Sequence, residues 1–212
     1  MARAAAVLLG PVPETRSRHD TGRRWWTDLA VPAASQRRFL FVVVPVAPWV
    51  FGAGASAYAV LPALMAGQGS SAPIAFSALM CLVALGVGFT VQQLGGRHGV
   101  VTALALLIVG MLLAGWAAAV LTVWAALLAA AVLGAGYGMA LLEGLQQIQR
   151  IAGPDDLAGL TAVFYSLTYL GFAVPAVLAF AVQRFSYPAM FGFGACAAAV
   201  CLLVAGLGSR RT

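Results

Sequence analysis

Four side chains in the second half of the chain have the types and spacing of a ligand-binding helix face. They are Tyr165, Thr168, Tyr169 and Phe172, which stand at positions i, i+3, i+4 and i+7. A helix presents such positions on one side, and three of these side chains carry hydroxyl groups inside an apolar run. We therefore predict Tyr165, Thr168 and Tyr169 as substrate-binding residues, with hydrogen bonding between helices as the alternative.

A polar stripe closes another apolar run earlier in the chain. It consists of Glu143, Gln146, Gln147 and Arg150, again at i, i+3, i+4 and i+7. One interpretation is an inner gate or a carboxylate that couples proton movement to transport. The other is a solvated helix end at which Glu143 and Arg150 find water or each other. Arg97, in a short basic connection, joins Glu143 and Arg150 as a gating or coupling candidate.

Single aromatic residues in other apolar runs are weaker substrate-binding candidates. Trp49, Tyr58 and Tyr137 each combine a ring with one polar atom. Such residues also fill packing gaps or lie in the interfacial aromatic belt of membrane proteins, so both interpretations stay open.

The sequence does not favour an enzyme. Ser56 lies in the small-residue run Gly54–Ala57, but neither His19 nor His98 falls within an apolar run, so Ser56 would lack a base. No Cys/His spacing typical of a metal site occurs, and the three cysteines fall inside apolar runs as small hydrophobic residues: Cys81, Cys196 and Cys201. We expect no metal, no cofactor and no catalytic residues.

The amino-acid composition indicates that these candidate sites lie in a membrane protein. Of 212 residues, 62% are hydrophobic and only 8% are charged, which no water-soluble core of this size requires. We therefore expect an all-α integral membrane protein. The formal net charge of +6 does not indicate nucleic acid binding, because the positions of the arginines fit membrane topology better.

Six apolar runs have the length that a helix needs to cross the hydrocarbon layer. We place the spans within residues 38–208, near Phe39–Met65, Pro73–Gln93, Val100–Ala119, Thr122–Glu143, Leu157–Val182 and Pro188–Gly208. Residues 1–37 form an arginine-rich N-terminal segment, and residues 209–212 form a short C-terminal end. Asp155 and Asp156 are placed to cap the fifth helix.

The arginines predict the orientation of the spans. All but one of the twelve basic residues, each of them Arg, fall on the side that holds both ends of the chain. Only Arg184 falls on the other side. The positive-inside rule therefore places both termini in the cytoplasm, and we expect a multi-pass protein of the cell membrane, in a bacterial inner membrane.

The spans differ in polarity. The first, second, fourth and fifth carry polar or hydroxyl-bearing side chains, whereas the third and sixth carry almost none. Polar groups in hydrocarbon cost free energy unless they face protein or water. We therefore expect the first group to surround any cavity, and the third and sixth spans to face lipid all round or to pack as outer supports.

A weak internal repeat divides the six spans into two units of three. Gly52 recurs at Gly134 and Gly110 at Gly192, both at an offset of 82, and Gly88-Phe89 recurs at Gly171-Phe172 at an offset of 83. Units with an odd number of spans must be inserted with opposite topology.

Several motifs together resemble the C-terminal half of a major facilitator superfamily (MFS) transporter, over essentially the whole chain. Residues 4–11 resemble the stub of helix six, and Val12–Arg16 resembles the charged segment that follows it. Gln92–Gly99 is similar to the second copy of the family's G-x-L-a-D-R-x-G loop. Leu94, Arg97 and Gly99 match that loop. Its Gly and Asp are replaced by Gln92 and Gly96, so a charge-relay role for the Asp is not carried over.

The later motifs extend the resemblance to helices ten and eleven. Pro154–Gly159 and then Tyr169–Gly171 with Pro175 resemble the loop and the start of helix eleven in drug and metabolite exporters. The fold that the resemblance implies is one MFS-type lobe built from two inverted three-helix repeats. Helices seven, eight, ten and eleven of the family line its central site, and these correspond to the four polar spans.

The implied function is transport of a small molecule, such as a drug-like compound or a metabolite, by alternating access of two lobes. This chain carries one lobe. It would therefore act as a half-transporter with a second copy or a partner chain, or be a truncated product, which we favour. The alternative is a non-transporting membrane scaffold or an inactive fragment. Substrate, direction and ion coupling are not encoded in this half.

Overall fold

The computed structural model describes residue 34 and residues 36–66, 73–95, 98–153 and 156–211, all within one compact unit. The predicted N-terminal segment therefore lies almost wholly outside the described residues. The described elements are helices: η2 (Phe39–Val43), α2 (Val44–Ala55), η3 (Ser56–Val60), α3 (Leu61–Ala66), α4 (Pro73–Leu94), α5 (Gly99–Val120), α6 (Val123–Ile151), α7 (Leu157–Tyr169), η4 (Leu170–Ala173), α8 (Val174–Ala181) and α9 (Tyr187–Arg211).

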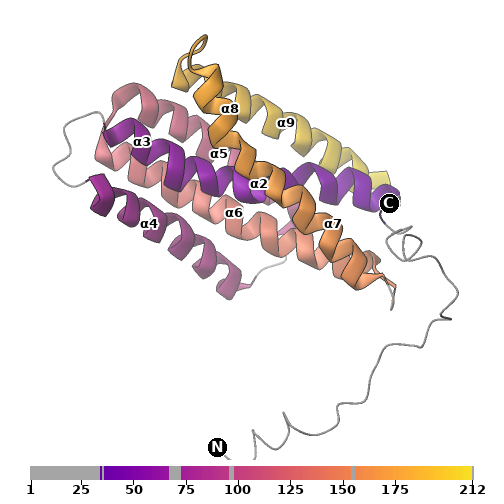
Figure 1. The fold of residues 1–212 in the computed structure, drawn as a ribbon. Coiled ribbons are helices and arrows are strands. Elements are labelled where there is room, and N and C mark those ends of the chain that lie inside the picture. Colours follow the sequence, from indigo (N-terminus) through magenta and orange to yellow (C-terminus); the bar gives the residue numbers. More distant parts are fainter. Residues whose placement is uncertain (1–33, 35, 67–72, 96–97, 154–155, 212) are drawn as a thin grey trace, which may run out of the picture. The chain divides into compact units, whose positions relative to one another are not determined.

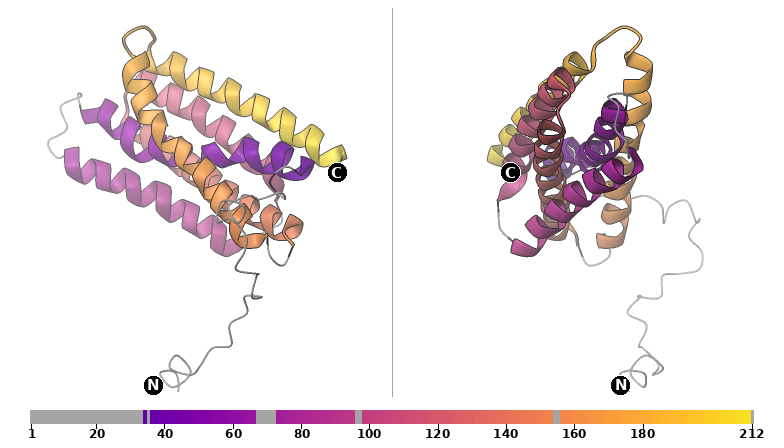
Figure 2. Two further views of the ribbon diagram at one scale, coloured as in Figure 1. Left: turned by 45° about the vertical axis from the view of Figure 1, so that its right-hand side comes forward. Right: turned by 90° about the vertical axis from the view of Figure 1, so that its left-hand side faces the viewer.

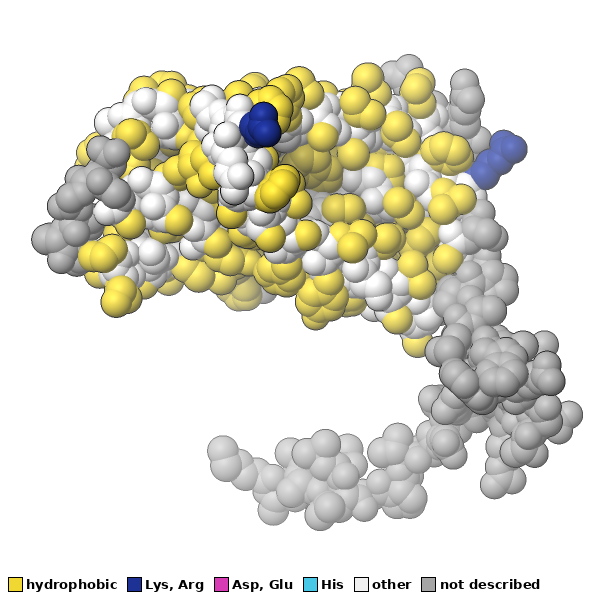
Figure 3. Space-filling view, turned by 45° about the horizontal axis from the view of Figure 1, so that its top comes forward, with side chains coloured by type: hydrophobic (Ala, Val, Ile, Leu, Met, Phe, Trp, Pro, Cys, Tyr) yellow, Lys and Arg dark blue, Asp and Glu magenta, His cyan; other side chains and the backbone are white. Residues whose placement is uncertain are grey.

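Within the described residues, six helices are long and apolar enough to cross a membrane, as in a multi-pass membrane protein. The first runs through η2, α2, η3 and α3, the fifth through α7, η4 and α8, and the others are α4, α5, α6 and α9. Figure 1 shows these six helices lying alongside one another, with α7 crossing over α2. Figure 3 shows hydrophobic side chains spread over one face of the helices, as lipid contact requires.

Five of the six predicted spans agree with the structure to within about two residues at each end, a usual uncertainty for helix boundaries. The fourth differs, because α6 continues past Glu143 to Ile151. Gln147 and Ile148 are buried, so this last part of α6 still packs one of its faces against the rest of the protein. The helix ends just before Gly153 and Pro154, residues that disfavour its continuation. The predicted end of this span at Glu143 was therefore wrong.

The first and fourth spans form the centre of the described unit. In their most apolar stretches, 61% and 56% of the residues are buried, against 17% in both the second and the fifth span. The two views of Figure 2 agree that α2 and α6 lie inside the other helices. The second and fifth spans therefore flank the centre and leave most of their surface uncovered.

The third span does not face lipid all round, so that one of the two alternatives expected for it was wrong. One face of α5 packs against α6, where Leu107 is fully buried beside Gly136. The opposite face exposes Leu112 and Trp116 to about half of their surface. Alanines and glycines on α6 let the two backbones approach, which explains how a span with almost no polar groups packs one face against the fourth span.

Two of the spans are irregular at the level where they cross. The fifth contains the 3₁₀ turn η4, in which the Val174 N–H donates to the Gly171 carbonyl. Pro175 has no N–H with which to close the α-helical bond to Gly171, so the tighter bond replaces it. The first span contains the π-helical segment η3, which begins at Ser56.

Candidate functional site

Three aromatic rings from the first and fifth spans form a cluster in which Phe172 stacks on both Phe51 and Tyr169. The Phe51 ring centroid lies 4.6 Å from that of Phe172 and 5.4 Å from that of Tyr169, and the Tyr169 and Phe172 centroids are 6.0 Å apart. The 3₁₀ turn explains the alignment of Tyr169 with Phe172, because residues three apart eclipse each other in a 3₁₀ helix. Tyr169 is 59% exposed, so the cluster is open to its surroundings.

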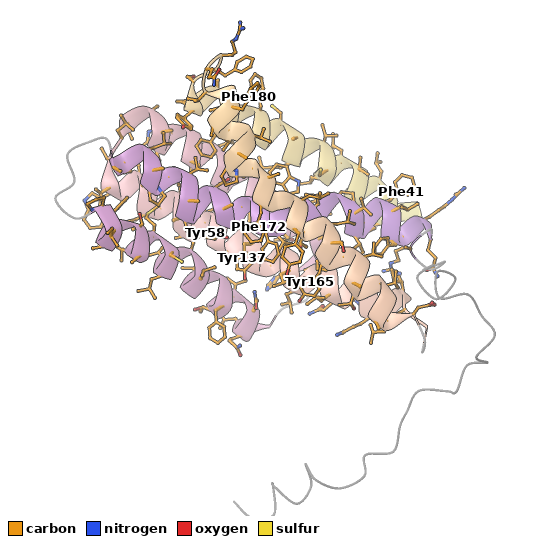
Figure 4. The ribbon with its side chains drawn as sticks, viewed as in Figure 1. Phe41, Tyr58, Tyr137, Tyr165, Phe172 and Phe180 are labelled. Atoms are coloured by element: carbon orange, nitrogen blue, oxygen red, sulfur yellow. The ribbon has the colours of Figure 1, made fainter. Side chains whose placement is uncertain are left out.

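Two more tyrosines, Tyr58 and Tyr137, are drawn in the same part of the view in Figure 4 as Tyr165 and Phe172. Tyr58 lies within electrostatic range of Tyr137. We call this set, together with Phe51 and Tyr169, the aromatic face. These residues come from the first, fourth and fifth spans, three of the four that were predicted to surround a cavity.

Tyr165 and Thr168 occupy different depths on this face. Tyr165 is half-buried, with its ring in an edge-to-face contact with Phe164, at a centroid distance of 5.8 Å. Thr168 is completely buried, and its hydroxyl donates to the Tyr165 carbonyl at 2.8 Å. The hydroxyl of Thr168 is therefore satisfied within its own helix and does not lie on the open surface that its spacing predicted.

Trp49 is directed away from the aromatic face. Its indole Nε1 lies 3.5 Å from the Cys201 sulfur of α9, a weak hydrogen bond that links the first and sixth spans. This contact engages the only polar atom of the side chain. Phe51 takes the place that the sequence reasoning gave to Trp49. Phe51 stands seven residues before Tyr58, and this helical spacing could have identified it.

The aromatic face offers ring surfaces and phenol groups rather than formal charge. The described parts of the first, second and fifth spans contain no carboxylate or amine within their apolar stretches. Such a surface can stack on planar groups, attract cations through the ring quadrupoles and hydrogen-bond through the tyrosine hydroxyls.

Glu143 has a role that neither sequence interpretation described. It is buried, with 1% of its surface exposed, and its Oε1 accepts a hydrogen bond from the Gly99 backbone N–H at 2.9 Å. Gly99 is the first residue of α5, so the carboxylate of α6 caps the N-terminus of a neighbouring span. Both the hydrogen bond and the helix dipole favour a carboxylate at this point.

Glu143 and Arg150 do not pair, although one interpretation allowed them to find either water or each other. Arg150 is exposed, and its Nη2 donates instead to Gln146 Oε1 at 3.4 Å. Gln147, one turn after Glu143, is buried, and its Oε1 has no hydrogen-bond partner among the described residues. The remaining gating candidate, Arg97, lies outside the described residues.

Asp156 lies at the predicted capping position of the fifth span but does not cap it through its side chain. Asp156 is the N-cap residue of α7, yet its side chain makes no capping hydrogen bond. Its carboxylate lies toward Gly153 instead, since Oδ2 is 3.2 Å from the place where a Cβ on Gly153 would be. Asp155 lies outside the described residues.

Two surface cavities in the described unit contain none of the predicted site residues. One, of about 560 Å³, lies between the ends of α3 and α5 and the start of α9. The other, of about 510 Å³, is an apolar hollow between α5 and α9, lined by residues such as Ile108 and Phe193. In the single chain, the aromatic face is a surface rather than an enclosed pocket.

Comparison with known proteins yields no further guide to the site. No protein-family model, no curated protein and no solved structure matches this chain. Among the described residues, no group of three or more His, Cys, Asp or Glu side chains is placed to hold a metal ion.

Proposed function

We propose that this chain is one lobe of an MFS-type secondary transporter and that the aromatic face is its half of the substrate site. The observation that carries the proposal is the cluster of Phe51, Tyr169 and Phe172, open to the surroundings between two spans. Aromatic and hydroxyl groups on a surface within membrane-crossing helices favour contact with a solute, water or another protein over contact with lipid alone.

The uneven burial of the spans supports the proposal that another lobe covers this face. The second and fifth spans are the least buried of the six, and both flank the aromatic face. In a two-lobed transporter the corresponding surfaces of the lobes enclose the central pathway. The second lobe would come from another copy of this chain or from a partner chain.

The orientation is part of the proposal. The arginines place the start of the first span and the end of α9 on the cytoplasmic side of a bacterial inner membrane. Glu143 and Gly99 then form a contact near the cytoplasmic surface, between the fourth span and the start of the third. Such a contact is suited to an inner gate or to fixing the third span.

Cysteine labelling tests the water-accessible face. In a variant with Cys81, Cys196 and Cys201 replaced by alanine, Tyr169→Cys is compared with Phe180→Cys on α8. Phe180 is 78% exposed, so both positions are open in the single chain. We expect a charged, membrane-impermeant thiol reagent to label Tyr169→Cys at least ten times faster. Equal rates at the two positions would contradict the proposal.

Transport itself is tested in proteoliposomes with a panel of fluorescent small amphipathic solutes. We expect uptake above that of protein-free liposomes, lost in Tyr169→Ala and kept in Phe180→Ala.

The alternative is a membrane scaffold that folds but transports nothing. The described residues contain six helices able to cross a membrane, which on our proposal form one lobe of two, and a lobe that found no partner would transport nothing. Native mass spectrometry in nanodiscs distinguishes the two, because transport requires a species with two lobes. A folded monomer without uptake of any solute would favour the scaffold.

A further inference from the structure

The larger of the two cavities lies at the end of the bundle away from Glu143, and the transport proposal does not use it. Its wall includes Leu64 of α3 and Leu121 just after α5, and its rim is the turn that leads from α8 to α9. Four helices end or begin around it, so it lies at the level where membrane spans reach the headgroup layer. We call it the Arg184 pocket.

The pocket contains an arginine whose charge has no partner in the part of the chain that the structure describes. Arg184 is exposed, and its side chain forms no hydrogen bond or ion pair with another described residue. The sequence contains no Asp or Glu in residues 66–73, 119–123 or 182–187, the segments that connect the spans at this end. Arg184 therefore has no counter-ion among the described residues, and the segments that connect the spans at this end contain no carboxylate that could supply one.

The other lining groups divide into polar and apolar sets. Gln183 and Ser186 flank the arginine with hydrogen-bonding side chains, whereas Leu64 and Leu121 present hydrocarbon. The volume of about 560 Å³ is in the range of about 300–1,000 Å³ that small-molecule sites occupy. A cavity with a cationic polar rim and an apolar wall fits an anion that carries a hydrocarbon chain.

We propose that the Arg184 pocket binds the phosphate headgroup of an anionic phospholipid from the leaflet at this end. The guanidinium forks onto phosphate oxygens in a bidentate pair, and a basic side chain near the bilayer surface attracts anionic lipid. The first acyl carbons lie along Leu64 and Leu121. The apolar wall favours the lipid over free inorganic phosphate, because free phosphate gains nothing from hydrocarbon contact.

The test is native mass spectrometry of the full chain released from nanodiscs of equal parts phosphatidylglycerol and phosphatidylcholine. We expect the wild type to retain phosphatidylglycerol preferentially, and Arg184→Gln to lower that preference about fivefold. The matched control is Arg150→Gln, which removes another exposed arginine at the opposite end of the bundle and leaves the preference unchanged. A preference unaffected by Arg184→Gln, or lowered equally by Arg150→Gln, overturns the proposal.

A second variant separates the cavity from the charge. Ala118→Phe fills the wall of the pocket and keeps Arg184, so we expect it also to lower phosphatidylglycerol retention. Inorganic phosphate at millimolar concentration is then added to the wild type. Displacement of the lipid by phosphate would identify a free-anion site and reject the lipid, whereas retention supports it. Circular dichroism of each variant checks that the helices are intact.

Discussion

Gly52 of α2 and Gly171 of η4 touch through their backbones where the first and fifth spans cross. A Cβ atom at Gly52 would lie 3.7 Å from the Gly171 Cα, and one at Gly171 would lie 2.9 Å from the Phe51 carbonyl carbon. A side chain at Gly171 does not fit between the helices, whereas a Cβ atom at Gly52 would make ordinary contacts. The aromatic cluster lies directly beside this crossing, because Phe51 and Phe172 are the chain neighbours of the two glycines.

A second crossing of the same kind joins the second and fourth spans. A Cβ atom at Gly88 of α4 would lie 2.9 Å from the Gly134 carbonyl oxygen of α6. In the internal repeat, Gly52 corresponds to Gly134 and Gly88 corresponds to Gly171. The contact between Gly52 and Gly171 in one crossing therefore corresponds to the contact between Gly134 and Gly88 in the other. Two inverted repeats that pack on each other are expected to make such equivalent contacts, so this correspondence supports the proposed architecture. The third pair of the repeat, Gly110 and Gly192, does not make equivalent contacts. Gly110 packs on Leu133, whereas nothing lies within 4 Å of a Cβ atom placed on Gly192.

We predict that Gly171→Ala destabilises the protein by about 1–3 kcal/mol, since the methyl group overpacks a backbone contact. Thermal unfolding in detergent, followed by circular dichroism, measures the change. Gly86→Ala is the matched control, because nothing lies within 4 Å of its Cβ position and alanine favours the helix. An equal loss of stability in both variants would show that the crossing is not tightly packed.

A second prediction concerns the cap of α5. Glu143→Leu leaves the Gly99 N–H without its acceptor and costs about 1–3 kcal/mol. Glu143→Gln keeps an acceptor oxygen and loses only the charge, so we expect it to cost less than Glu143→Leu. Unfolding of the two variants is compared with that of Gln149→Leu, an exposed position on the same helix. If Glu143→Gln and Glu143→Leu were equally harmful, charge rather than the hydrogen bond would dominate.

The spans could be predicted because hydrocarbon imposes one requirement on every residue of a run. Length and apolar content alone placed helices such as Pro73–Leu94 and Leu157–Ala181 almost to the residue. The extension of α6 beyond Glu143 could not be predicted in this way. It depends on which side of the helix α5 covers, and the sequence does not show that a glutamate at this position faces protein.

The candidate site shows the same division. Helical spacing placed Tyr165, Tyr169 and Phe172 near one another, but it could not foresee that the 3₁₀ turn at Gly171 changes the phase of the face. The spacing also could not show that Thr168, in α7 before that turn, is buried and bonded to its own helix. The missing residue was Phe51. Its spacing of seven residues from Tyr58 could have drawn attention to it, but its ring contacts with Tyr169 and Phe172 on a distant span leave no local pattern in a single sequence.

A third prediction concerns the end of α5. Leu121 is a non-glycine residue in the left-handed backbone conformation, with φ of 51°. Glycine adopts this conformation without the steric cost that a Cβ imposes, so we expect Leu121→Gly to raise stability by up to about 1 kcal/mol. Thermal unfolding again measures it, and Thr122→Gly, at an extended residue, serves as the control that should not gain. A destabilised Leu121→Gly would mean that the leucine side chain contributes more through packing than its backbone costs.

The last prediction concerns the unpaired oxygen of Gln147. A buried acceptor without a partner costs about 1–3 kcal/mol, and methionine has a similar length without that acceptor. We therefore expect Gln147→Met to be neutral or stabilising in thermal unfolding, although it places a less polar residue beside Glu143. Gln146→Met is the control, because Gln146 is bonded to Arg150 near the surface and gains nothing from the change. A clear loss of stability in Gln147→Met alone would show instead that this oxygen accepts a hydrogen bond in the intact protein, from water or from a partner lobe. Hydrogen exchange at Gly99 separates these outcomes further, because a bond lost at Gln147 would loosen the neighbouring cap of α5 and speed that exchange.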